Sequence, residues 1–79
     1  MLTERQQLQM RRQICSKYGF EPNSVKLTSV TAMCNLVTDD LELEVDFVHQ
    51  QSGFFQSEKF ILDVSDMRKM PVMVVDMCG

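Results

Sequence analysis

The 79-residue chain has no tryptophan, one histidine and three widely separated glycines, so it carries no glycine-rich phosphate-binding loop. Its longest apolar run, residues 72–75, is far shorter than the ~20 residues that span a bilayer. The N-terminus is polar from Thr3 onward and does not resemble a secretory signal. We therefore expect a soluble, cytoplasmic protein with no membrane partner.

The three cysteines, Cys15, Cys34 and Cys78, are odd in number and form no CxxC pair. A disulfide framework in a small secreted domain is normally even and denser, and a zinc site needs about four clustered ligands. We therefore expect no metal and no cofactor. Cys15 and Cys34 are predicted to be reduced core residues, and Cys78 is predicted to be exposed.

The net charge of −3 is distributed unevenly. Residues 1–26 carry five basic and two acidic residues (+3), whereas residues 27–79 carry three basic and nine acidic residues (−6). The length predicts one small domain, residues 1–79, that buries only ~60–65% of its unfolded surface. Because nucleic-acid-binding domains are usually basic overall, the acidic total argues against direct nucleic-acid binding.

The most informative stretch runs from Asp39 to His49, where apolar and acidic residues alternate. Side chains on a β-strand point alternately to opposite faces, so this stretch predicts a strand with one apolar face and one acidic face. The apolar face consists of Leu41, Leu43, Val45 and Phe47. The acidic face consists of Asp40, Glu42, Glu44 and Asp46.

The rest of the chain predicts an α+β fold, with an N-terminal helix packed on one face of a three- to four-stranded antiparallel meander. Thr3 followed by Gln6 is typical of a capping box, and Gly19 is suited to end the helix. The expected elements are a helix at 3–18, strands at 25–37, 39–49 and 54–64, a helical turn at 65–70 and a short edge strand at 72–77. The apolar residues of the first strand do not alternate strictly, which indicates a β-bulge or a strand that is partly covered on both faces. The expected core is Leu8, Met10, Ile14, Tyr18, Leu41, Leu43, Val45, Phe47, Phe60 and Leu62.

No catalytic constellation is recognisable, and we expect a protein that is not an enzyme. His49 is the only histidine, and a lone histidine near a turn is more often solvated than catalytic. Carboxylates on one strand form a row rather than a converging pair. The helix also presents Arg5, Arg12 and Lys17, either as a face that enters a nucleic-acid groove or as the solvated side of a packed helix; the second interpretation is favoured.

The acidic row is the strongest functional candidate. Its ~6.5–7 Å spacing is close to the ~6–7 Å between phosphates along a nucleic-acid strand, so it is suited to a basic groove, although a solvated sheet face has the same pattern. The leading hypothesis is a small protein-binding regulator or inhibitor, of a kind that viruses or mobile elements encode, with a larger basic partner. The alternatives are a self-assembling subunit, such as a homodimer through an edge strand or the Met/Val tail at 72–77, and a nucleic-acid binder that uses the basic helix.

Overall fold

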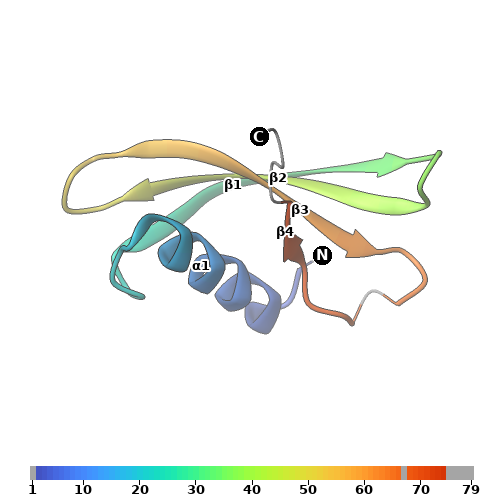
Figure 1. Ribbon diagram of the computed structural model, residues 1–79, viewed down its shortest axis with the longest axis horizontal. Helices are drawn as coiled ribbons and strands as arrows, with labels where there is room; N and C mark the ends of the chain where they lie inside the picture. Colours follow the sequence, from blue (N-terminus) through green and yellow to red (C-terminus); the bar gives the residue numbers. More distant parts are fainter. Residues whose placement is uncertain (1, 67, 75–79) are drawn as a thin grey trace.

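The computed structural model describes residues 2–66 and 68–74. One helix precedes four strands that form a single antiparallel sheet in the order β1-β2-β3-β4. The helix lies across one face of this sheet (Figure 1), which confirms the predicted α+β fold. No helix in the described part of the chain is long and apolar enough to cross a membrane. The elements are α1 (Glu4–Tyr18), β1 (Val25–Asn35), β2 (Asp40–His49), β3 (Phe55–Asp63) and β4 (Val72–Met73).

Local sequence signals set the ends of α1. The Gln6 amide N–H donates to Thr3 Oγ1 at 3.1 Å, and the Thr3 amide N–H donates to Gln6 Oε1 at 2.8 Å, which confirms the capping box. Gly19 ends the helix with φ +73°, a left-handed conformation that glycine adopts without a steric penalty. The helix therefore begins and ends where short-range chemistry predicts.

β2 is an inner strand and pairs with both β1 and β3. Glu44 lies opposite Thr31 of β1 and Lys59 of β3. The register of β1 shifts between Leu27 and Ser29, which confirms the expected bulge. The alternation of β2 therefore sets which side chains face α1 along the whole sheet.

The core lies between α1 and the apolar face of β2 and β3. Two predictions were only partly right, because Tyr18 and Leu41 are partly buried and pack against the core. The prediction for Leu8 was wrong: it is 37% exposed, because it borders an open groove between α1 and the first residues of β1. Seven of the predicted core residues are confirmed as buried: Met10, Ile14, Leu43, Val45, Phe47, Phe60 and Leu62.

The helix covers only part of the sheet, and the hairpin of β1 and β2 extends past it (Figure 1). Residues 28–34 of β1 are all exposed, because α1 does not reach one face of this hairpin and nothing in the described chain covers the other. Cys15 is buried as predicted, but the prediction for Cys34 was wrong, because its side chain lies on this uncovered part of β1. Cys78 lies outside the described residues.

After β3 the chain turns before it returns as β4. The Ser65 amide N–H and hydroxyl both donate to Asp63 Oδ1, so the Asp63 carboxylate supplies the acceptor at this turn. Met67, within the predicted helical turn, lies outside the described residues, as do residues 75–77 of the predicted last strand. β4 itself lies at the sheet edge, as expected.

Two glutamines of α1 hold this returning segment. Gln13 donates through Nε2 to the Pro71 carbonyl and accepts at Oε1 from the Met73 amide N–H, both at 2.8 Å. Gln6, which is buried, donates through Nε2 to the Lys69 carbonyl at 3.0 Å. The side-chain amide of Gln13 thus supplies hydrogen-bond partners for the Pro71 carbonyl and the Met73 amide, which β3 does not pair.

Candidate functional site

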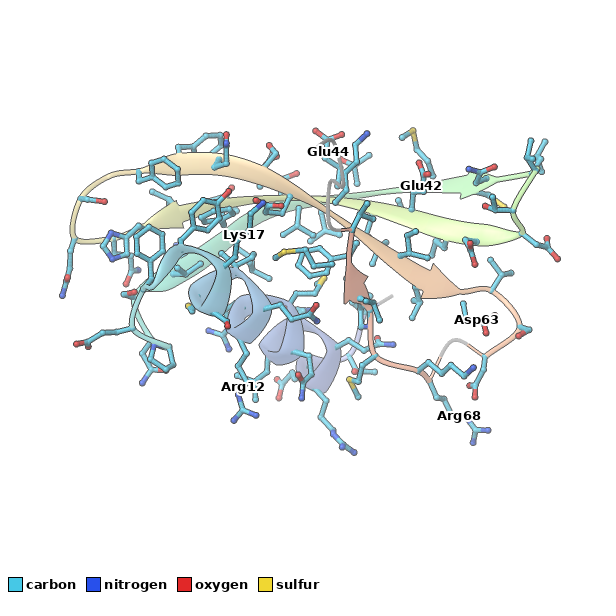
Figure 2. All side chains as sticks on the ribbon, in the orientation of Figure 1. Arg12, Lys17, Glu42, Glu44, Asp63 and Arg68 are labelled. Carbon is cyan, nitrogen blue, oxygen red and sulfur yellow. The ribbon has the colours of Figure 1, made fainter. Side chains whose placement is uncertain are left out.

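The face of the sheet opposite α1, here called the open face, carries the acidic row of Asp40, Glu42, Glu44 and Asp46. Glu42 and Glu44 point away from α1 (Figure 2), while the alternate residues Leu43 and Val45 are buried against the helix. Glu44 is exposed, and the other three carboxylates are half-buried among neighbouring strands. The structure therefore brings all four predicted site residues together on one uncovered surface.

The acidic row receives few compensating contacts. The Ser57 hydroxyl donates to Asp46 Oδ1, and Asn35 Nδ2 donates to Glu42 Oε1 at 3.4 Å. Lys59 lies opposite Glu44 in the β2–β3 register, yet forms no ion pair with it. Within residues 2–66 and 68–74, no cation is ion-paired with any member of the acidic row. Its negative charge is available to an external cation.

Asp63 extends the negative surface by one strand, because it lies opposite Asp40 in the β2–β3 register. Hydrogen bonds from the side chain and backbone of Ser65, together with Lys69 Nζ at 3.2 Å from Oδ2, hold the pKa of Asp63 below its usual value. Asp63 therefore stays ionised at neutral pH, although Lys69 offsets part of its charge.

Apolar side chains flank the acidic row on the neighbouring strands. Met33 of β1 and Ile61 of β3 lie on either side of Glu42, and Val72 of β4 lies beyond Ile61. Met33 is 53% exposed and Val72 is 64% exposed. The open face thus combines carboxylates along β2 with apolar surface beside Glu42, whereas Thr31 and Lys59 lie beside Glu44.

The three basic helix residues do not form one free cationic surface. The Lys17 ammonium lies 2.7 Å from Glu58 Oε1, between α1 and β3. Arg12 points away from the sheet (Figure 2), and Arg5 lines a groove on the β1 side of α1. The structure separates the roles of these residues, whereas the sequence suggested that they share a face.

Glu58 is a buried carboxylate that was not recognised in the sequence. The hydroxyl of Tyr18 and the ammonium of Lys17 both donate to its Oε1. The hydrogen bond to Glu58 raises the pKa of Lys17, while burial and then the same carboxylate raise the pKa of Tyr18. The alternation of side chains along the strand could have revealed it, because Glu58 lies two residues before the core residue Phe60 and therefore faces the same side of the sheet. This cluster joins α1 to β3 and leaves the carboxylate engaged by two donors.

His49 belongs to an aromatic cluster at the β2–β3 turn, which shares Tyr18 with the contacts of Glu58. Its ring stacks on Phe20 with centroids 4.0 Å apart, and its Nδ1 lies 2.6 Å from Ser52 Oγ. Tyr18, Phe47 and Phe54 complete this cluster. Among the described residues, no three histidine, cysteine, aspartate or glutamate side chains are grouped as metal ligands.

No protein-family model, curated protein or solved structure matches the chain. The open face combines carboxylates that have no ion pair in the described part of the chain with exposed apolar surface. Protein–protein contacts commonly combine complementary charge with buried apolar area.

Proposed function

We propose that the protein is a small non-enzymatic binding protein that acts stoichiometrically as a regulator or inhibitor. Its open face contacts a basic surface of a larger protein. The supporting observation is that four carboxylates lie in a row on an uncovered sheet face without a paired cation in the described part of the chain. Aligned like charges repel one another, and a basic partner relieves this repulsion.

The geometry of the row favours a surface that ordinarily holds nucleic acid. Alternate residues on a strand are ~6.5–7 Å apart, which is close to the ~6–7 Å spacing of phosphates along a nucleic-acid strand. A rigid sheet holds these charges in place, so little ordering entropy is lost on binding. An inhibitor of a nucleic-acid machine, of the kind that viruses and mobile elements encode, fits this arrangement.

The flanking side chains favour a protein over a simple polycation as the partner. Met33, Ile61 and Val72 border the acidic row, and their burial adds to the free energy of binding at ~25 cal/mol per Å² of apolar surface. A basic protein with apolar residues beside its cations complements both features. Such a contact has salt-sensitive association and a partly apolar interior.

The direct test is affinity purification from the native host followed by mass spectrometry, with the wild-type chain and Glu42→Lys/Glu44→Lys as baits. The matched control is Glu4→Lys/Glu21→Lys, which gives the same net charge of +1 (−3 plus two changes of +2) at two exposed positions outside the open face. The proposal predicts a basic protein that the wild type and the control retain and that the open-face variant loses. Equal retention by both variants would contradict it.

A further inference from the structure

We propose that the exposed edge of β1 is a homodimer interface. β1 pairs antiparallel with β1 of a second copy across a two-fold axis at Ala32. The β1–β2 hairpin tip of each copy, residues Leu36 and Val37, lies in a groove between α1 and β1 of the other copy. This interface uses the sheet edge rather than the open face, so it is independent of the proposed function.

β1 is an unusually unprotected edge strand. It has 11 residues, whereas the opposite edge strand, β4, has two. An edge strand presents unpaired backbone N–H and C=O groups, which proteins commonly protect with charges, prolines or bulges. No charged residue or proline occurs from Leu27 to Thr38, and the bulge near Ser29 protects only one end. The stretch from Ser29 to Asn35 is therefore free to pair with another strand.

The two parts of a self-complementary contact lie on this edge. Leu36 and Val37 at the hairpin tip are 90% and 94% exposed. A groove of about 620 Å³ lies between α1 and the first half of β1, and its apolar lining comes from Leu8, Val25 and Leu27. A two-fold interface requires both halves of each contact on one chain, and here the apolar tip and the groove supply them.

The register follows from the position of these parts along β1. With Ala32 on the axis, Val30 pairs with Cys34 of the second copy, and the tip reaches the level of the second copy's Leu27. Leu27 is a groove residue, so strand pairing and tip insertion occur together. Val30, Ala32 and Cys34 share the helix-side face, and the two copies join them into one continuous strip.

Charge supports a second copy as the occupant of the groove. Three cations, Arg5, Arg11 and Lys26, line the groove beside one anion, Glu4. None of these cations forms an ion pair within residues 2–66 and 68–74. The same hairpin turn carries the exposed Asp39, two residues after Val37, and in this register its carboxylate arrives near the basic groove. In this dimer the hairpin tip of the second copy covers Leu8, an apolar helix residue that is partly exposed in the single chain.

The proposed axis is perpendicular to the sheet, so both helices lie on one side of an eight-stranded sheet and both open faces lie on the other. Three strand spacings separate the two copies of β2, which places the two acidic rows about 14 Å apart. The dimer leaves the open face uncovered.

Sedimentation equilibrium on the full-length chain tests the interface, with Leu36→Asp/Val37→Asp as the disrupting variant. Both side chains are almost fully exposed, so the substitution is not expected to unfold the monomer. The matched control is Val72→Asp, an exposed apolar position on the β4 edge. We expect dimers for the wild type and the control, and monomers for the tip variant. A wild-type monomer at high micromolar concentration would overturn the proposal, as would a dimer that only Val72→Asp disrupts.

Disulfide trapping tests the register independently. In a Cys34→Ser/Cys78→Ser background, Ala32→Cys places two thiols on the two-fold axis, and mild oxidation is expected to give a covalent dimer in high yield. Gln51→Cys, at the β2–β3 turn, is the control and is expected to remain monomeric under the same conditions. If Ala32→Cys cross-links no better than Gln51→Cys, the copies do not pair at Ala32 and the proposed interface is wrong.

Discussion

The ammonium nitrogen of Lys17 lies 2.7 Å from Oε1 of Glu58, and this contact joins the last turn of α1 to β3. The hydroxyl of Tyr18 donates to the same oxygen. The Glu58 side chain is 8% exposed, and a buried carboxylate is tolerated when donors of this kind surround it. The cluster therefore helps to fix α1 over the core.

The first prediction concerns loss of this carboxylate. Glu58→Ala removes the acceptor for two donors, and we expect the free energy of unfolding to fall by about 1–3 kcal/mol. The exposed Glu44→Ala is the control and is expected to change it by less than ~0.5 kcal/mol. Urea denaturation followed by circular dichroism measures both. Equal effects of the two substitutions would show that Glu58 does not anchor the helix.

The second prediction is a loss of stability at alkaline pH. The fold raises the pKa values of both Lys17 and Tyr18, so the folded state holds these protons more tightly than the unfolded chain. Their contribution is complete below the unfolded pKa values, about 10 for both groups, and is lost as pH rises through the raised folded values. Urea denaturation between pH 8 and about 11 is expected to show this decline. Lys17→Met/Tyr18→Phe should flatten the decline of the free energy of unfolding with pH, whereas the exposed Lys26→Met should not. An unchanged decline in the double variant would show that Lys17 and Tyr18 do not cause it.

The third prediction concerns the side chain that holds β4. Gln13→Ala removes both the donor to Pro71 and the acceptor for Met73. We expect a loss of about 1–3 kcal/mol and faster hydrogen exchange at the Met73 amide. Gln7→Ala, which removes only an exposed contact of 3.4 Å to Leu2, is the control. If Met73 exchanges at the wild-type rate in Gln13→Ala, the glutamine does not secure β4.

The fourth prediction separates the two cysteines by thiol reactivity. Burial raises the pKa of Cys15, whose thiol donates to the Glu21 carbonyl at 3.3 Å, whereas Cys34 is exposed on a part of the helix-side face that α1 does not reach. In a Cys78→Ser background, we expect Cys34 to react with a thiol reagent at least about tenfold faster than Cys15. Denaturation should remove the difference. Fast labelling of Cys15 in the folded chain would contradict its placement in the core.

Short-range patterns predicted much of this fold. The Thr3/Gln6 capping box, Gly19 and the alternation from Asp40 to Phe47 each depend on neighbouring residues, and each is confirmed. Leu8 and Cys34 were misplaced for a different reason. Their burial depends on how much of the sheet α1 covers, which is a tertiary property that periodicity does not encode.

The position of the acidic row was readable in the sequence, but its surroundings were not. Alternation put four carboxylates on one face of β2, whereas the absence of an ion pair to them among the described residues depends on where Lys17 and Lys59 lie in the folded chain. Glu58 and Gln13 were missed because polar residues were assigned to solvent. Glu58 lies at a core-facing position and accepts hydrogen bonds from polar groups of α1. Gln13 contacts the returning chain and accepts a hydrogen bond from its backbone.

The central claim is that the open face binds a basic partner, and the most direct test measures the dissociation constant of the captured partner as a function of salt concentration. The test variant is Glu42→Gln/Glu44→Gln, and the control is Glu4→Gln/Glu21→Gln; both change the net charge from −3 to −1. We predict that the test variant binds at least about tenfold more weakly at low salt and depends less steeply on salt. Equal dissociation constants and equal salt dependence for the two variants would contradict the claim.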